Sequence, residues 1–106
     1  MQRANLNEDG NVVVEKQGFG YFNITGTNTY VLKTGSGKLH SITFNKPVAT
    51  GVVLIYNNSA GEGTLIGTIT VPANPQPSTL LYDIDFESGL TIVVTTAAQD
   101  ITVSYN

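Results

Sequence analysis

The feature that most constrains the fold of this chain is a two-residue alternation of apolar and polar side chains, in short runs that recur at spacings near ten residues. In residues 80–87 alternate positions are apolar, namely Leu80, Tyr82, Ile84 and Phe86. Residues 89–95 and 100–105 alternate in the same way. Successive side chains of a strand point to opposite faces, so these runs predict half-buried β-strands. No window of 11 or more residues shows the i, i+3, i+4, i+7 apolar stripe of a helix.

The composition favours the same structure. The chain holds 14 Thr, 11 Val and 8 Ile, so that 33 of its 106 residues are β-branched and suited to strands. Its length is that of one domain. We therefore predict an all-β, single-domain β-sandwich, jelly-roll or Greek-key like, with about eight or nine strands and no significant helix. Residues 1–14 are polar before an apolar triplet and are expected to form an N-terminal arm, with the sandwich over residues 15–106.

The pattern also predicts how individual runs face. Residues 52–56 (VVLIY) are apolar on both faces, which predicts a central strand or one whose second face another subunit covers. Residues 57–63 are expected to form a loop that bulges from the body, and the prolines of residues 72–78 to form a stiff crossover. Gly67 lies where a neighbour can approach closely. The remaining predicted inward positions are Leu65, Ile69, Val71, His40, Ile42, Phe44, Ile101, Val103, Tyr105, Leu90, Ile92 and Val94.

Several functional classes are excluded by what the sequence lacks. It has no Cys, which removes disulfides, thiolate zinc sites, iron–sulfur clusters and a cysteine nucleophile. The net charge is −3 and Lys and Arg do not cluster, so neither nucleic acid nor an anionic membrane is an expected partner. No apolar run approaches the ~20 residues that cross a bilayer, and residues 1–5 do not read as a signal peptide. No cofactor is expected.

One motif has the form of a catalytic sequence. Asp83, Asp85 and Glu87 reproduce the Asp-x-Asp-x-Glu pattern of retaining chitinases, in which the Glu protonates the glycosidic oxygen. That chemistry needs a (β/α)₈ barrel of ~250 residues, which this chain cannot form. We interpret the three acids as one solvated strand face, and the chain as no enzyme. A weak Ca²⁺ site at these carboxylates is the remaining alternative, although an Asp-x-Asp-x-Asp-Gly loop is missing.

Other candidate motifs have simpler structural interpretations. Residues 35–38 (GSGK) resemble the end of a phosphate-binding loop, but Leu39 occupies the position where that loop needs Ser or Thr, so a hairpin turn is expected. His40 is the only imidazole and is interpreted as a rim or core histidine rather than a base. The five tyrosines could include a platform for stacking sugars, but fit the edge of a core equally well.

Four segments together carry a family resemblance. They are residues 33–42 (KTGSGKLHSI), 55–66 (IYNNSAGEGTLI), 86–94 (FESGLTIVV) and 100–105 (DITVSY). Over residues 30–105 the chain resembles small virion proteins of tailed bacteriophages. The resemblance implies a β-sandwich module that decorates or cements the capsid, or sits at head–tail and tail surfaces, without catalytic residues. Residues 1–29 fall outside it.

The expected function is therefore that of a capsid decoration or cement protein that stabilises the phage head. It would be made in the host cytoplasm and located on the capsid surface of the virion. Its expected partners are the major capsid protein and copies of itself, as a homo-oligomer for which a trimer is one candidate. The alternative is a tail, fibre or carbohydrate-binding module that recognises host-surface glycans. The predicted partner interface is Leu6, Val12, Val13, Val14, Val53 and Ile55, where the arm would add to a neighbour's sheet edge.

Overall fold

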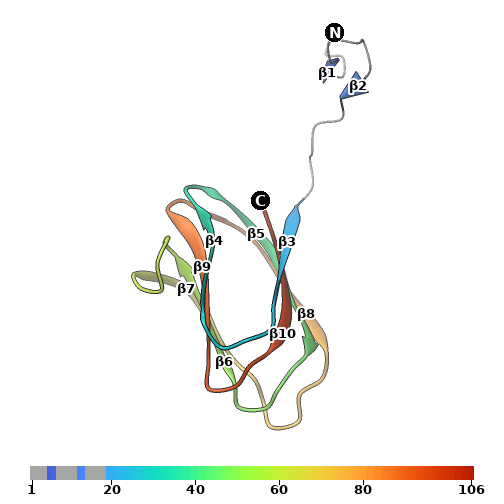
Figure 1. Ribbon diagram of the computed structural model, residues 1–106, viewed down its shortest axis with the longest axis vertical. Coiled ribbons are helices and arrows are strands. Elements are labelled where there is room, and N and C mark those ends of the chain that lie inside the picture. Colours follow the sequence, from blue (N-terminus) through green and yellow to red (C-terminus); the bar gives the residue numbers. More distant parts are fainter. Residues whose placement is uncertain (1–4, 7–11, 14–18) are drawn as a thin grey trace.

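The computed structural model describes residues 5–6, 12–13 and 19–106, in which every regular element is a strand (Figure 1). The strands are β1 (Asn5–Leu6), β2 (Val12–Val13), β3 (Gly20–Ile24), β4 (Thr29–Thr34), β5 (Gly37–Lys46), β6 (Val52–Asn57), β7 (Thr64–Thr70), β8 (Ser78–Phe86), β9 (Gly89–Thr95) and β10 (Asp100–Tyr105). β1 and β2 pair with each other in antiparallel register. The described part of the chain holds no helix of the length and apolarity needed to cross a membrane.

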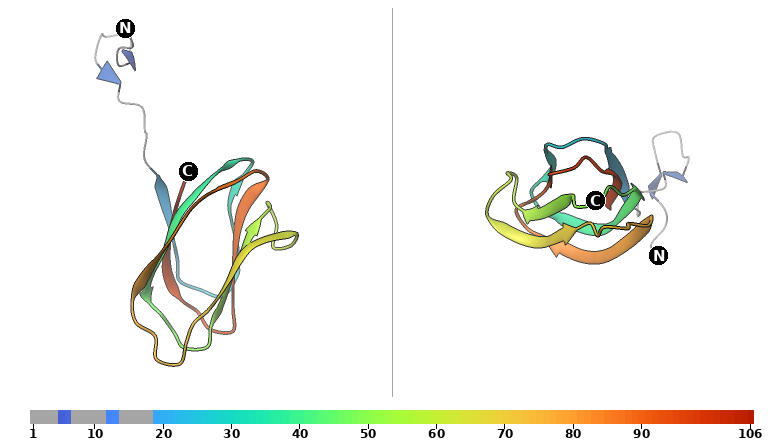
Figure 2. Two further views of the ribbon diagram at one scale, coloured as in Figure 1. Left: turned by 180° about the vertical axis from the view of Figure 1, so that it is seen from behind. Right: turned by 90° about the horizontal axis from the view of Figure 1, so that it is seen from below.

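The other eight strands form two antiparallel sheets that pack face to face (Figure 2). Sheet I has the strand order β3-β10-β5-β8, and sheet II has the order β4-β9-β6-β7. Every connection from β3 onward except the one between β6 and β7 passes from one sheet to the other. This order is that of a jelly roll, the eight-stranded double Greek key. The prediction of an all-β sandwich is confirmed.

The core lies between the sheets and follows the predicted alternation in β8, β9 and β10. Leu90, Ile92 and Val94 of β9 are buried, as are Ile101 and Val103 of β10. In β8 the inward residues are Tyr82, Ile84 and Phe86, while Leu81, Asp83 and Asp85 are exposed. The completely or nearly completely buried apolar side chains are Ile24, Leu39, Ile42, Phe44, Val53, Ile55, Val71, Phe86, Leu90, Ile92, Val94, Ile101 and Val103.

The strand over residues 52–57 is central, because β6 lies between β9 and β7. Its inward side chains are Val53 and Ile55, each 0% exposed. The prediction that these two residues contact a partner is therefore wrong, because the opposite sheet of the same domain already covers them. The outer face of β6 instead carries Val52, Leu54 and Tyr56, which are half-buried. Of the other predicted contacts, Leu6, Val12 and Val13 are described only as paired backbone, and Val14 lies outside the described residues.

Two predicted facings are wrong because β-bulges shift the alternation. In β5 the pairing with β10 shifts between Leu39 and Ser41, so Leu39 enters the core and His40 points outward. In β7 the pairing with β6 shifts at Ile66, which places Leu65 on the outer face, 47% exposed. A bulge inserts one residue into a strand and reverses the facing of everything beyond it. Ile69, half-buried, and Val71, buried, do pack on the core as predicted.

Tyrosines close the open sides of the sandwich. The Tyr105 hydroxyl donates to the Leu32 carbonyl across the two sheets (3.2 Å), and the Tyr30 hydroxyl donates to the Gly26 carbonyl (3.0 Å). On the other side Tyr82 packs on Gly67, where an added Cβ would lie 3.3 Å from the tyrosine oxygen. Burial raises the pKa of the Tyr82 hydroxyl above its ordinary value. The predicted close approach at Gly67 is confirmed.

Candidate functional site

The acidic row of β8 does not converge on a metal position. Asp83 and Asp85 are exposed on the outer face of sheet I, and Glu87 lies in the turn that follows β8. Asp83 is paired with His40, and Asp85 lies directly opposite Lys38 in the β5 register. Among the described residues no group of three or more His, Cys, Asp or Glu side chains could hold a metal ion. The three acids act as separate surface charges.

The bulges in β5 and β8 create a small cluster around the single histidine. His40 Nδ1 is hydrogen-bonded to Asp83 Oδ1, and both side chains are partly exposed. Asp83 has a positive φ of 48° and lies at the bulge of β8. The Phe19 ring stacks on the imidazole with 4.5 Å between centroids. A carboxylate and a phenyl ring orient His40, and no nucleophile is hydrogen-bonded to it within residues 19–106.

The loop over residues 57–63 stands out from sheet II (Figure 1) and is fixed to the domain by hydrogen bonds at its base. Asn57 Oδ1 accepts from the backbone N–H groups of Glu87 and Ser88 at 3.1 and 3.0 Å. The Thr91 hydroxyl donates to the Asn58 carbonyl (2.8 Å), and Thr91 is 0% exposed. Gly61 packs so closely over sheet II that an added Cβ would meet Val93 at 3.1 Å. The loop therefore bulges from the body as predicted, and it also lies over part of the outer face of sheet II.

The neighbouring turn over residues 34–37 is tight, but the prediction of a hairpin turn is wrong, because it joins β4 of sheet II to β5 of sheet I, which do not pair with each other. Gly35 has a φ of 88°, which a glycine adopts without strain. Its N–H donates to the Ser88 carbonyl (3.1 Å), which ties the β4–β5 turn to the β8–β9 turn at the same end of the sandwich.

The outer face of sheet II, which we call the uncharged face, presents three rows of uncharged side chains, and residues 57–63, with the exposed Glu62, lie over part of it. The registers place rows of opposed residues across it, including Thr29–Val93–Leu54–Thr68 and Thr95–Val52–Thr70. A third row joins Val31, Thr91, Tyr56 and Leu65. Val31 and Leu65 are 50% and 47% exposed. Every outward position of these four strands in the three rows is Val, Leu, Tyr or Thr.

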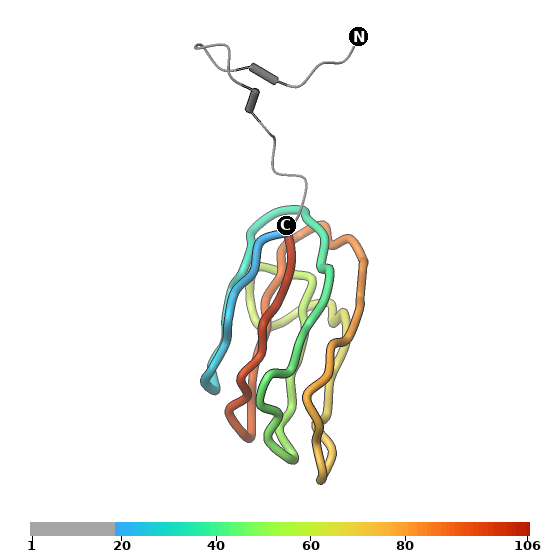
Figure 3. Tube along the Cα trace, turned by 90° about the vertical axis from the view of Figure 1, so that its right-hand side faces the viewer, coloured from blue at the N-terminus to red at the C-terminus, as the bar shows by residue number. Residues whose placement is uncertain are grey.

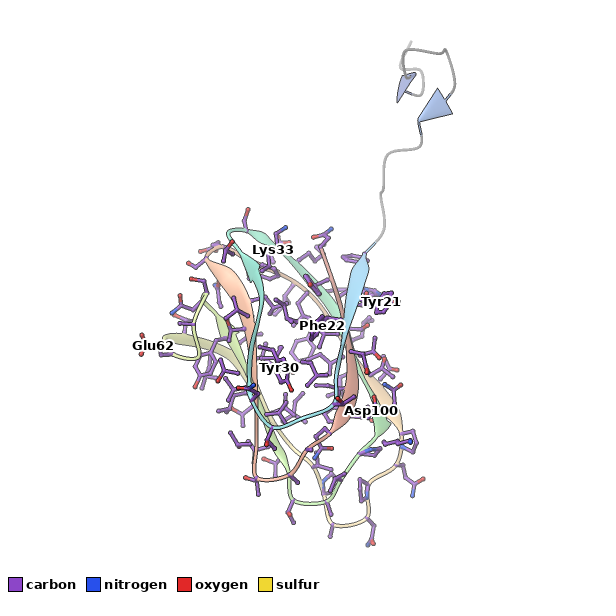
Figure 4. The ribbon with its side chains drawn as sticks, in the orientation of Figure 1. Tyr21, Phe22, Tyr30, Lys33, Glu62 and Asp100 are labelled. Carbon is purple, nitrogen blue, oxygen red and sulfur yellow. The ribbon has the colours of Figure 1, made fainter. Side chains whose placement is uncertain are left out.

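The outer face of sheet I has a different character. Its two central strands present hydroxyl side chains, Ser104 and Ser41 in one row and Thr102 and Thr43 in the next. Two larger residues flank the serine row on the edge strands, Tyr21 at 76% exposed and Leu81 at 67% exposed. Tyr21 points away from the body of the domain (Figure 4). It is the one tyrosine of the five whose side chain is largely free to contact another molecule.

A polar network lies beside these hydroxyl rows. Asn23 Nδ2 donates to Asp100 Oδ1 (2.8 Å), and Asn45 Nδ2 donates to the same oxygen (3.2 Å). These two hydrogen bonds, with a smaller contribution from Lys46, hold the pKa of the Asp100 carboxyl below its ordinary value. The network fixes the end of β10 against β3 and β5.

One pocket of about 230 Å³ lies at the opposite end of the domain from the 57–63 loop, beneath the proline-rich crossover. Phe44, Ile69, Val71 and Leu80 form its apolar wall, together with Pro47, Pro72 and Pro75. Drug-sized ligands occupy pockets of roughly 300–1,000 Å³, so this one is small for such a ligand.

Comparison of the chain with protein-family models, with curated proteins and with solved structures finds no match.

Proposed function

We propose that this protein is a non-enzymatic structural component of a bacteriophage virion, a decoration or cement protein that stabilises the capsid. The observation that carries the proposal is the uncharged face of sheet II. Apolar side chains lose little hydration energy when another protein covers them, and a threonine hydroxyl loses much less than a charged side chain does. The resemblance of residues 30–105 to small phage virion proteins supports the same function. By analogy alone, the jelly-roll strand order also agrees, since viral capsid and lectin domains use it.

A cement protein stabilises the shell by binding the assembled state in preference to its separated subunits. The major capsid protein and neighbouring copies of the chain are the proposed partners. The N-terminal arm, residues 1–14, is proposed to extend across a neighbour, with Val12–Val13 adding to a sheet edge.

A pair of matched substitutions tests the uncharged face. Thr68→Lys introduces a charge on the outer face of sheet II, and Thr79→Lys introduces the same charge on the outer face of sheet I. Both threonines are exposed and both lie on edge strands. Binding to capsids stripped of the protein, followed by co-sedimentation, should be weakened at least tenfold by Thr68→Lys and little by Thr79→Lys. Equal binding of the two variants contradicts the assignment of the face.

Copy number tests the location. Quantitative mass spectrometry of purified particles should find hundreds of copies of a decoration protein, and a dozen or fewer of a tail component.

Deleting residues 1–14 should leave a folded domain that no longer binds capsids; retained binding rules out a role of the arm in capsid binding.

The second candidate is a module of a tail, of a fibre or of a free carbohydrate-binding protein, with host-surface glycans as ligand. It is favoured by Tyr21, whose exposed ring lies beside the hydroxyl rows of sheet I. Aromatic rings stack on sugars, and hydroxyl and amide groups bind their oxygens. Glycan-array binding that Tyr21→Ala abolishes and Tyr56→Ala leaves intact would favour this candidate over cement.

A further inference from the structure

The four edge strands of the sandwich differ in how they are protected against pairing with another strand. An edge strand offers a row of unpaired N–H and C=O groups, and proteins block such rows with bulges, charges or prolines. β3 and β8 are the edges of sheet I, and β4 and β7 are the edges of sheet II (Figures 1 and 3).

Three of the four edges are interrupted. The pairing of β4 with β9 shifts between Val31 and Lys33, and that of β7 with β6 shifts at Ile66. In β8 the shift falls at Tyr82 and Asp83, where Asp83 also has a positive φ. In each case the extra residue is on the edge strand itself. β4 and β8 carry charged residues as well, Lys33 on one and Asp83 and Asp85 on the other.

The remaining edge, β3, has none of these devices. Its five residues pair with β10 in unbroken register from Ile24↔Ile101 to Gly20↔Tyr105. Its sequence, GYFNI, contains neither a charge nor a proline. Two neighbouring aromatic residues are exposed along it, Tyr21 at 76% and Phe22 at 42%. Tyr21 points outward, and Phe22 points toward Tyr30 at the open side of the sandwich, with 6.1 Å between the ring centroids (Figure 4).

We infer that β3 is a pairing edge, and that its partner is β3 of a second copy of this chain. A second copy has the same four edges, and three of them are interrupted. Its β3 is therefore the edge available for unbroken pairing. Two identical strands pair antiparallel about a two-fold axis, so the contact closes on itself as a dimer. A cyclic trimer would need β3 to match a different, interrupted edge. Full overlap of the two five-residue strands places Phe22 opposite Phe22 of the second copy and joins two copies of sheet I.

The exposed area sets the strength of this contact. Aromatic side chains bury roughly 150–250 Å² each, so the exposed parts of Tyr21 and Phe22 amount to about 240 Å² per copy, or ~480 Å² in the pair. Stable interfaces bury about 1,200–2,000 Å². The pair is therefore weak in dilute solution and forms where copies are concentrated. This inference rests on the proposed function in naming a second copy as the partner and specifies the contact, and the association of two copies can be measured without a capsid.

Single-cysteine variants test the geometry, because the natural chain contains no Cys. Directly opposed residues of an antiparallel pair have Cα atoms about 4.5–5.5 Å apart, which a disulfide spans. In the full-length protein at ~1 mM, Phe22→Cys should form disulfide dimers at least tenfold faster than Leu81→Cys, its control on the other edge of sheet I. Val31→Cys and Leu65→Cys are the matching controls for the edges of sheet II. Equal rates at all four positions, or a faster rate at a control, overturn the inference.

Two charged variants make the test independent of any effect of Phe22→Cys on folding. Sedimentation of the wild-type chain should show concentration-dependent dimers, which Tyr21→Lys abolishes and Leu81→Lys leaves intact. A wild-type chain that stays monomeric at ~1 mM overturns the inference. Two segments of a second copy can pair with β3, namely its own β3 and its N-terminal segment, and Val13→Asp distinguishes between them. The dimer should persist in this variant if β3 is the partner, and its loss assigns the edge to the N-terminal segment of the second copy and overturns the proposal.

Discussion

The side-chain amide of Gln99 joins two connections at one end of the sandwich, and its replacement gives a stringent test of the structure. Gln99 is 1% exposed. Its Oε1 accepts from the Val48 N–H (2.7 Å), while its Nε2 donates to the carbonyls of Val48 (2.8 Å) and Ala97 (3.3 Å). Gly51 packs directly on this amide, since an added Cβ would lie 2.1 Å from Nε2. The residues between β5 and β6 are thereby fixed to those between β9 and β10.

Gln99→Glu exchanges the NH₂ group for oxygen with almost no change in volume. At neutral pH the new carboxylate can still accept from the Val48 N–H, but its other oxygen faces two carbonyl oxygens. Two lost hydrogen bonds at ~1 kcal/mol each, and a buried charge with a single donor, lower the free energy of unfolding by about 3 kcal/mol.

Burial and the two carbonyls should raise the pKa of the introduced carboxyl above ~4.3, the value of a glutamic acid in an unfolded chain. The folded state then binds the proton more tightly than the unfolded state. The destabilisation is therefore largest above the raised pKa, and shrinks as the pH falls toward ~4.3, where the protonated carboxyl donates to a carbonyl.

Thermal unfolding followed by circular dichroism between pH 4 and 8 measures this effect. At roughly 4–8 °C per kcal/mol, we expect Gln99→Glu to lower Tm by about 12–24 °C at pH 7, relative to the wild-type chain at the same pH. The control is Gln76→Glu, the same chemical change at an exposed position of the crossover. A loss at pH 7 no larger than that of the control refutes the buried amide network. A loss that does not shrink toward pH 4 refutes the assigned pKa shift.

Two further predictions concern contacts that hold neighbouring strands together. Gly67→Ala should lower the free energy of unfolding in urea by about 1 kcal/mol, because the added Cβ would lie 3.3 Å from the Tyr82 hydroxyl. In a Tyr82→Phe background the loss should be less than half as large. Additive effects of the two substitutions would contradict the contact. The Asp100 carboxyl should titrate below its ordinary pKa in carbon-detected NMR, and Asn23→Ala should move the midpoint upward. Since the folded pKa is lowered, the stabilisation from Asp100 is present above the unfolded value and is lost as the pH falls through the folded one.

The alternation of side chains was sufficient to predict the sandwich and most of its core. Strands whose pairing is regular follow it directly, as Leu90, Ile92 and Val94 of β9 show. The alternation also predicted that Asp83 and Asp85 lie on the outer face, and both are exposed there. The chitinase-like motif therefore does not face the interior. The candidate surface was less predictable. Residues 52–56 are apolar on both faces, and the sequence could not say which alternate set, Val53 and Ile55 or Val52, Leu54 and Tyr56, faced inward.

What the sequence by itself determined is the class of fold, because a period of two, together with turn residues at short intervals, is compatible only with paired strands. The strand order, the bulges and the state of each edge were decided by the tertiary structure alone. A bulge cannot be located from the local sequence when either of two neighbouring residues can be the extra one. The outward position of His40 was therefore decided by the registers of β5 with β8 and β10. The exposure of Tyr21 likewise followed from the edge position of β3, which depends on pairing with residues about eighty positions away in the chain.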